Sequence, residues 1–207
     1  MNNIVKGVLL YGFGGHARSI ADVSLASGFE TLLFIDSNAR PNETFAGFPV
    51  IKEMPSALPE DWIAFPAAGG TAQRQAQLED IKRRGWRTGC IISATATLGV
   101  LSKLGTGCFV GHHAHVGPNA TIGDGAIINN GAVVEHDCQI GSFTHISVNS
   151  TVAGGTIIGD GCFIGAGSTV INSIKIGHNI TLGAGGCFIK DVSEPGTYAG
   201  TPAKRIK

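Results

Sequence analysis

Aliphatic residues recur at every sixth position between Ile92 and Phe188, the last of which is aromatic, and no insertion breaks the frame. The residue after the aliphatic is usually glycine, as at Gly117, and the fourth residue after it is small, as at Cys108. A spacing of six fits neither the period of about 3.6 of an amphipathic helix nor the alternation of about two of a strand. The pattern predicts a repeat architecture. The series is Ile92, Leu98, Leu104, Val110, Val116, Ile122, Ile128, Val134, Ile140, Ile146, Val152, Ile158, Ile164, Val170, Ile176, Leu182 and Phe188.

One large and one small inward residue in every six suits a short strand followed by a tight corner. Three such sides close a triangular coil, and the coils stack so that each aliphatic residue lies on the one below it. The stacked aliphatic side chains then form a continuous apolar column, while glycine recurs where a corner needs unusual backbone angles or crowds its neighbour. We therefore expect residues 89–207 to form a parallel β-helix followed by a carboxyl-terminal tail.

The first 88 residues lack this frame and alternate between apolar runs and helical patterns. Short apolar runs at 8–11, 32–35 and 62–66 are strand candidates, and residues 17–27 and 73–84 are helix candidates that each end at a glycine. Strands alternating with helices predict a small parallel sheet of Rossmann-like type. The predicted organisation is an α/β domain at 1–88, followed by the β-helix domain at 89–207.

A glycine-rich turn follows the first predicted strand and opens the first helix. It reads Gly12-Phe13-Gly14-Gly15-His16, and glycines in this context let phosphate oxygens approach backbone N–H groups at a helix amino end. Asp36 ends the next strand, where an acidic residue meets a ribose hydroxyl in dinucleotide sites. A plain tight turn remains the alternative. Because His16 and Arg18 depart from the dinucleotide fingerprint and the sheet is short, a sugar nucleotide fits better than NAD.

Composition narrows the classes of function. The 207 residues carry zero formal net charge, which argues against a nucleic-acid binder. No apolar run approaches the roughly 18 residues of a membrane span, and residues 1–6 lack the layout of a secretory signal. Cys108, Cys138 and Cys162 occupy the small inward slot of the repeat, so we read all five cysteines as reduced thiols in a cytoplasmic protein.

The repeat is broken where Glu135, His136 and Asp137 follow Val134 in place of glycine. These residues fall at a corner, where side chains leave the coil. A histidine beside a carboxylate is the minimal general-base unit, because the carboxylate fixes the imidazole tautomer and stabilises the imidazolium. A solvated surface histidine is the alternative, and it is the reading we keep for His112, His113 and His178. A zinc site built from His112, His113 and His115 lacks acidic or thiolate partners at suitable spacing.

Two further positions complete a candidate acetyl-transfer site. Gly154 lies one 18-residue coil after His136, and its bare backbone leaves space for a thioester and a pantetheine arm. His145 lies half a coil onward, within possible reach of this site on a neighbouring subunit. There it would donate a hydrogen bond to the acyl oxygen as negative charge develops.

These motifs together resemble a known family. The repeat block, the Glu135-His136-Asp137 corner, the Phe143-Thr144-His145 segment and the ending at 198–204 resemble the hexapeptide-repeat acyltransferases. With the glycine turn in front, residues 7–206 resemble the subgroup that acetylates sugar nucleotides, namely the bacterial UDP-4-amino-sugar (bacillosamine-pathway) and perosamine N-acetyltransferases and the sialic acid O-acetyltransferases. The resemblance implies a left-handed parallel β-helix, a hand opposite to the general right-handed crossover rule. It also implies homotrimers with active sites between subunits.

The resemblance also implies roles for individual residues. His136 matches the catalytic base, and Asp137 its orienting partner, where family members often have Glu. Asn129 matches the acceptor pocket and His145 a position near the acetyl carbonyl. Gly154, Ala166 and Ala184 match positions whose backbone contacts pantetheine. Pro202 and Lys204 match the tail that packs on coenzyme A, where Lys204 or Arg205 would pair with its phosphates. The sugar-nucleotide positions are matched by Gly12, Gly14, Gly15, His16 and Asp36.

The implied function is direct acetyl transfer from acetyl-CoA to the amino group of a nucleotide-linked amino sugar, most simply a UDP-4-amino-4,6-dideoxy sugar, without a metal. The alternatives are O-acetylation of a sugar hydroxyl and N-acetylation of GDP-perosamine. Outside acetyl transfer, a β-helix scaffold or carbonic anhydrase would leave the amino-terminal domain unexplained, although His112, His136 and His145 could be recruited as metal ligands. An NAD-binding protein is disfavoured by the short amino-terminal domain.

Overall fold

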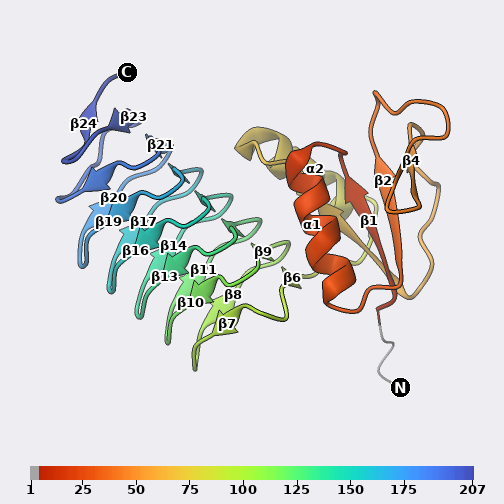
Figure 1. Cartoon of the computed structure of the whole chain (residues 1–207), viewed down its shortest axis with the longest axis horizontal. Coiled ribbons are helices and arrows are strands. Elements are labelled where there is room, and N and C mark those ends of the chain that lie inside the picture. The colour runs from red at the N-terminus through yellow and green to blue at the C-terminus, as the bar shows by residue number, and fades with distance from the viewer. Residues whose placement is uncertain (1–4) are drawn as a thin grey trace. The chain divides into compact units, whose positions relative to one another are not determined.

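The computed structural model describes residues 5–207 (Figure 1). Residues 1–4, which contribute to the expectation that the chain lacks a secretory signal, lie outside the described residues. The chain divides into two compact units, the first ending at Ala94 and the second running from Thr95 to Lys207. Within residues 5–207, neither helix has the length and apolar character needed to cross a bilayer.

The first unit is an α/β domain built on a five-stranded sheet in the order β3-β4-β2-β1-β5. Strand β1 pairs in parallel with both β2 and β5, and all five of its residues are buried. The predicted strands and helices are present, but the antiparallel β3–β4 hairpin was not predicted. The elements are β1 (Gly7–Tyr11), α1 (Gly15–Ala26), β2 (Thr31–Ile35), β3 (Thr44–Phe45), β4 (Phe48–Ile51), β5 (Trp62–Pro66), α2 (Thr71–Arg83) and β6 (Ile91–Ile92).

The second unit is a parallel β-helix whose strands are mostly two residues long. They are β7 (Thr97–Leu98), β8 (Lys103–Leu104), β9 (Phe109–Val110), β10 (His115–Val116), β11 (Thr121–Ile122), β12 (Ile127–Ile128), β13 (Val133–Val134), β14 (Gln139–Ile140), β15 (His145–Ile146), β16 (Thr151–Val152), β17 (Ile157–Ile158), β18 (Phe163–Ile164), β19 (Thr169–Val170), β20 (Lys175–Ile176), β21 (Ile180–Leu182), β22 (Cys187–Phe188), β23 (Gly196–Ala199) and β24 (Lys204–Arg205). The predicted fold class, an α/β domain followed by a parallel β-helix, is confirmed.

Three parallel sheets form the sides of the coils seen stacked in Figure 1. The first contains β7, β10, β13, β16, β19 and β22; the second β8, β11, β14, β17 and β20; the third includes β9, β12, β15, β18, β21 and β23. Val134 pairs with Val116 on one side and Val152 on the other, which is a spacing of 18 residues per coil. The hexapeptide period therefore places each aliphatic residue directly on its equivalents in the adjacent coils.

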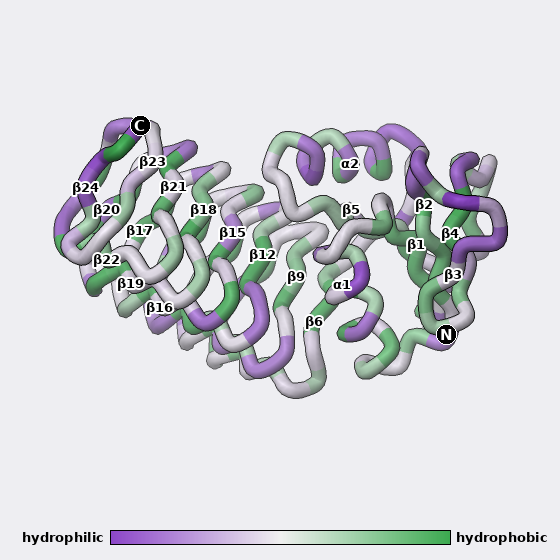
Figure 2. Tube along the Cα trace, turned by 45° about the horizontal axis from the view of Figure 1, so that its top comes forward, coloured by the Kyte–Doolittle hydropathy of each residue, from purple (hydrophilic) through white to green (hydrophobic). Residues whose placement is uncertain are grey.

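The interior of the coils is apolar and tightly filled. Val134, Cys138 and Ile164 are 0% exposed, so the aliphatic and small slots both face inward. Figure 2 shows the corresponding hydrophobic colour along strands such as β9 and β12. All five cysteines are free thiols, and burial raises the pKa of the Cys138 and Cys162 thiols. These thiols fill space in the coil and are poor nucleophiles.

Each corner makes two different demands on the chain. The residue directly after the aliphatic residue approaches the backbone of the next coil. A Cβ at Gly117 would lie 2.5 Å from the backbone nitrogen of His136. Two places later the backbone turns through positive φ, with values of 63° at Asn119 and 58° at Asp137. Close approach therefore favours glycine at the first position, while the second position takes glycine or a residue such as asparagine or aspartate that tolerates the left-handed region.

Candidate active site

His136 and Asp137 form a hydrogen-bonded pair on the corner between β13 and β14. The Nδ1 of His136 lies 2.8 Å from Oδ2 of Asp137. The other carboxylate oxygen, Oδ1, accepts a 2.9 Å hydrogen bond from Nδ2 of Asn119, one coil earlier. Hydrogen bonds from Asn119, and then from His136, lower the pKa of the Asp137 carboxyl below its ordinary value. The carboxylate is thus held on both oxygens and stays ionised.

This pairing determines which imidazole nitrogen can accept a proton. An ionised carboxylate only accepts hydrogen bonds, so Nδ1 of His136 must carry the hydrogen that it donates to Asp137. In the neutral ring Nε2 then has the free lone pair. The His136 side chain is 60% exposed in the single chain, so the ring is accessible from outside the coil. The pair has the arrangement of a general base.

The next coil supports the imidazole from below. A Cβ at residue 154 would lie 2.5 Å from both Nε2 and Cε1 of His136, so the ring lies over the bare backbone of Gly154. The Gly155 N–H donates a 2.8 Å hydrogen bond to the His136 carbonyl oxygen. The sequence suggested that Gly154 leaves room for a thioester. In the structure, the ring of His136 takes up the space beside this glycine.

A second histidine and aspartate, His178 and Asp160, meet at another corner with a longer contact and an added backbone hydrogen bond. The N–H of Asp160 donates a 3.0 Å hydrogen bond to Nδ1 of His178, and the N–H of Ser142 donates one of 2.7 Å to Asp160 Oδ1. Nδ1 of His178 also lies 3.3 Å from Asp160 Oδ2, compared with 2.8 Å between the side chains of His136 and Asp137.

The remaining histidines of the repeat lie against threonines. His112 and His113 both lie near Thr95, and Nδ1 of His115 lies 2.7 Å from Oγ1 of Thr97. Among residues 5–207, no cluster of three or more His, Cys, Asp or Glu side chains has the placement to hold a metal ion.

Asn129 and His145 form another pair, separate from His136 and Asp137. The Nδ2 of Asn129 donates a 3.1 Å hydrogen bond to Nε2 of His145, while Oδ1 of Asn129 accepts one of 2.8 Å from the Asn130 N–H. This places the ring hydrogen of neutral His145 on Nδ1. The ring is 8% exposed and packs edge-to-face on Phe163, with 5.0 Å between centroids. His145 is thereby fixed in one orientation.

The positions expected to meet coenzyme A lie on the later coils and the tail. Ala166 and Ala184 are stacked one coil apart, linked by a 2.9 Å hydrogen bond from the Gly185 N–H to the Ala166 carbonyl. Pro202 and Lys204 line a cavity of about 380 Å³. Its remaining lining is Phe188, Ile189, Lys190, Val192, Tyr198, Ala203 and Arg205. Arg205, proposed from sequence as a phosphate partner, forms a 2.6 Å ion pair with Glu194.

The glycine turn of the α/β domain forms a separate cavity of about 330 Å³. Its lining includes Gly12, Gly14, Gly15, His16 and Asp36, so the structure brings all five predicted sugar-nucleotide residues together. Gly12 has φ of +114°, a region that disfavours side chains, and Gly14 is the N-cap of α1. A Cβ at Gly14 or Gly15 would meet nothing within 4 Å. The cavity therefore opens onto bare backbone at a helix amino end.

Asp36 ties this turn to the next strand. Its Oδ2 accepts a 3.0 Å hydrogen bond from the Phe13 N–H, and its Oδ1 accepts one of 2.9 Å from the Asn38 N–H. The carboxylate thus lies beside the glycine turn at the carboxyl end of β2. This is the position expected for a residue that meets a ribose hydroxyl.

His16 is held in its neutral form within this cavity. Burial, followed by the positive charge of Arg74, lowers the pKa of His16 to about 4. Arg74 is 1% exposed and donates a 2.8 Å hydrogen bond to the Gly69 carbonyl oxygen. A buried guanidinium beside the cavity favours an anionic ligand.

Sequence reasoning missed three residues that shape these sites. Asn119 could have been found from the period, because it lies 18 residues before Asp137 in the same corner position. Gln77 and Arg74 lie on α2 and gave no signal. The Gln77 side chain donates a 2.8 Å hydrogen bond to the Tyr11 carbonyl oxygen and accepts one of 3.0 Å from the Ala68 N–H. Gln77 also lines the glycine-turn cavity, so these contacts join α2 to the end of β1 beside it.

Two family descriptions match different parts of the chain. Residues 7–81 match the PglD N-terminal domain, and residues 102–136 and 137–172 match the bacterial transferase hexapeptide family (six repeats). The two matches cover the α/β domain and the central coils of the β-helix. The first match includes the residues of the glycine turn, and the second includes His136 and Asp137.

Solved structures similar to this chain extend over nearly its whole length. The acetyltransferase domain of PglB from Neisseria gonorrhoeae is 28% identical with a TM-score of 0.90, and the match covers 97% of this chain and 100% of that one. The same domain in complex with acetyl coenzyme A also gives a TM-score of 0.90. A mutant of perosamine N-acetyltransferase from Caulobacter crescentus, in complex with CoA and GDP-perosamine, is 28% identical with a TM-score of 0.85, covering 97% of each chain.

Proposed function

We propose that this chain, whose α/β domain matches the PglD N-terminal domain and whose β-helix matches the bacterial transferase hexapeptide family, transfers the acetyl group of acetyl-CoA to the amino group of a nucleotide-linked amino sugar. The observation that carries this proposal is the 2.8 Å contact between His136 Nδ1 and Asp137 Oδ2, which leaves Nε2 to accept a proton. Two similar proteins support the substrates: one is solved with acetyl coenzyme A and the other with CoA and GDP-perosamine.

The proposed reaction is a direct transfer. The sugar amine attacks the thioester carbonyl of acetyl-CoA, forming a C–N bond and a tetrahedral oxyanion. Nε2 of His136 takes the proton from the attacking nitrogen, and Asp137 stabilises the resulting imidazolium. Collapse of the intermediate breaks the C–S bond, and the imidazolium returns the proton to the departing thiolate. The products are the N-acetyl sugar nucleotide and CoA.

His145 is proposed to stabilise the oxyanion. The hydrogen bond from Asn129 to its Nε2 holds the ring beside Asn129, where the acceptor is proposed to bind. Its fixed orientation against Phe163 reduces the reorganisation needed during the reaction. Asn129, beside His145, is proposed to contact the acceptor sugar.

A homotrimer would unite these two pairs of residues. We propose that His136 and Asp137 of one subunit face Asn129 and His145 of a neighbouring subunit, so that each site lies between the β-helices of two subunits. Pantetheine would then run past Gly154, Ala166 and Ala184 toward the tail at Pro202 and Lys204. Holding both substrates along one groove would supply much of the rate.

The amino-terminal cavity is proposed to hold the nucleotide diphosphate. Backbone N–H groups at Gly14 and Gly15 and the helix amino end would meet phosphate oxygens, with Asp36 toward the ribose and His16 toward the diphosphate or sugar. Buried Arg74 adds positive charge near this position.

The test is incubation of the purified protein with acetyl-CoA and a panel of UDP-, GDP- and CMP-linked sugars, each with and without a free amine. Thiol release is followed with a chromogenic disulfide, and the acetylated product is identified by mass spectrometry. We expect release only with amino sugars. Release only with CMP-sialic acid or with hydroxyl sugars would replace the proposed acceptor with an alcohol.

A further inference from the structure

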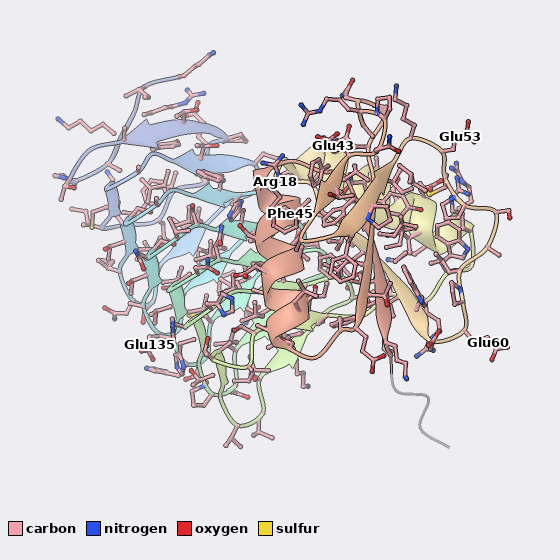
Figure 3. The ribbon with its side chains drawn as sticks, turned by 45° about the vertical axis from the view of Figure 1, so that its right-hand side comes forward. Arg18, Glu43, Phe45, Glu53, Glu60 and Glu135 are labelled. Carbon is pink, nitrogen blue, oxygen red and sulfur yellow. The ribbon has the colours of Figure 1, made fainter. Side chains whose placement is uncertain are left out.

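A second cavity of about 450 Å³ adjoins the glycine turn of the α/β domain and has a different chemistry. We call it the aromatic cleft; its lining includes Phe13, Arg18, Arg40, Glu43, Thr44 and Phe45. Figure 3 shows Arg18, Glu43 and Phe45 gathered at one end of this domain, with Glu60 at the other end. The cleft lies between the start of α1 and the unpredicted β3 hairpin.

The aromatic cleft has a rigid aromatic wall. The Phe13 and Phe45 ring centroids are 6.3 Å apart, and both rings pack edge-to-face on Phe34, at 5.2 Å and 5.9 Å. Phe34 is 0% exposed, so the cluster is anchored in the core. The Arg18 guanidinium carbon lies 4.5 Å from the Phe13 centroid. Aromatic faces and a planar guanidinium are the surfaces on which a planar heterocycle stacks.

The edge of the cleft carries a fixed negative charge. The Glu43 side chain is only 11% exposed and accepts hydrogen bonds from the Arg40 backbone N–H at 2.9 Å and from Arg40 Nε at 3.1 Å. A further bond comes from Arg40 Nη2. Hydrogen bonds from Arg40 lower the pKa of the Glu43 carboxyl, so it is ionised and only accepts. Three of its roughly four acceptor positions are filled, and one remains for a ligand N–H group.

Phe13 connects this cleft with the glycine-turn cavity. Phe13 lines both the aromatic cleft and the glycine-turn cavity. Its backbone N–H donates a hydrogen bond to the Asp36 carboxylate. A nucleoside diphosphate with its phosphates at the glycine turn and its ribose at Asp36 would therefore direct its base past Phe13.

We propose that the aromatic cleft binds the base of the nucleotide and that Glu43 makes it select guanine over uracil. This inference rests on the proposed function. Guanine would place its N1–H on the one remaining acceptor position of Glu43, with the N2 amino group beside the carboxylate and O6 toward an arginine of the cleft. Uracil presents one N–H between two carbonyl oxygens, which the Glu43 carboxylate repels.

The experiment compares the affinities of GDP and UDP by isothermal titration calorimetry. It uses the full-length protein and the Glu43→Gln and Phe45→Ala variants. Glu60→Gln is the matched control, because Glu60 is exposed and lines neither cavity. We expect GDP to bind the unaltered protein roughly tenfold or more tightly than UDP. Glu43→Gln should remove most of this difference, Phe45→Ala should weaken both nucleotides, and Glu60→Gln should change neither.

Equal or weaker binding of GDP by the unaltered protein would overturn the inference, as would a GDP preference that survives Glu43→Gln. Circular dichroism of each variant establishes that it is folded. The acetyl-transfer assay separates the two proposals. Transfer to nucleotide amino sugars with no dependence on Glu43 would leave the proposed function standing without this inference. GDP binding that depends on Glu43, without transfer to any nucleotide amino sugar, would leave a guanine site in a protein of another activity.

Discussion

The side chains of His136 and Asp137 lie together although the two residues are adjacent in sequence, with 2.8 Å between Nδ1 and Oδ2. Neighbours in an extended strand would point to opposite faces. Here the backbone of Asp137 has φ of +58°, so the corner turns sharply and brings both side chains to one side. The hexapeptide corner thus creates a base and its orienting carboxylate from consecutive residues.

Replacing Asp137 by Asn tests the role of this carboxylate. An amide is not an obligate acceptor and does not stabilise an imidazolium, so we expect kcat to fall roughly 100- to 10,000-fold with little change in acetyl-CoA affinity. Asp160→Asn is the matched control, because Asp160 is an equally exposed corner carboxylate beside His178. Steady-state kinetics of both variants make the comparison. Equal kcat values for the two variants would contradict a catalytic role for Asp137.

Replacing Gly154 by Ala should displace the His136 ring while leaving the β-helix folded. The added Cβ would lie 2.5 Å from ring atoms of a side chain that is free to rotate outward. We expect a large loss of kcat and a nearly unchanged melting temperature. Gly141→Ala is the contrasting variant, because its Cβ would lie 2.4 Å from the backbone carbon of Gly159. That variant should lose thermal stability. Full activity in Gly154→Ala would show that the ring does not need its position over residue 154.

His16 should make folding stability depend on pH. The unfolded imidazole takes up a proton below about pH 6.5, whereas in the folded protein the pKa is lowered to about 4. The unfolded state therefore binds more protons between these values, so stability is full above about pH 6.5 and falls as the pH is lowered toward 4. The shift corresponds to about 3 kcal/mol.

Urea unfolding at pH 7 and at pH 4.5 measures this effect. His16→Asn should lose less stability between the two pH values than the unaltered protein. His113→Asn is the control, since His113 is exposed and its φ of +57° suits asparagine. It should keep the original pH dependence. A His16→Asn variant with that same dependence would mean that His16 does not stay neutral in the fold.

Mixed trimers test whether the active site is shared between subunits. His136→Ala and His145→Ala should each be inactive alone, because each removes one half of every proposed site. Co-expression of the two variants should restore part of the activity, since some interfaces then combine an intact His136 with an intact His145. Sedimentation analysis establishes the trimer. Absence of any restored activity in mixed trimers would place both residues in a site within one subunit.

The β-helix could be predicted from the sequence because each coil packs only on the coils before and after it. Each coil repeats the same inward residues, so the six-residue spacing from Ile92 to Phe188 determines which side chains stack and where the corners fall. The same arithmetic places Gly154 one coil after His136, and it would have placed Asn119 one coil before Asp137. The handedness of the coil did not follow from this pattern and came from the family resemblance.

The features that the sequence did not predict depend on contacts between residues that follow no repeating spacing in the sequence. The β3 strand is only two residues long, so it gave no alternation to detect, although its hairpin forms the wall of the aromatic cleft. Arg74 reads as a polar residue on an exposed helix, yet it is 1% exposed beside His16. The neutral state of His16 is a consequence of that burial, which only the folded arrangement reveals. The period places Gly154 one coil after His136, but it did not show that the imidazole itself fills the space beside this glycine.

The most direct test of the account is the initial rate of CoA release by His136→Asn, measured with acetyl-CoA and the preferred nucleotide amino sugar. Asparagine keeps polarity at the corner and removes the proton-accepting nitrogen, and His178→Asn is the matched control on another corner. We predict that His136→Asn retains acetyl-CoA binding and its oligomeric state but loses at least about 100-fold in rate, while His178→Asn remains active. A rate for His136→Asn equal to that of the unaltered protein would contradict the assignment of His136 as the base.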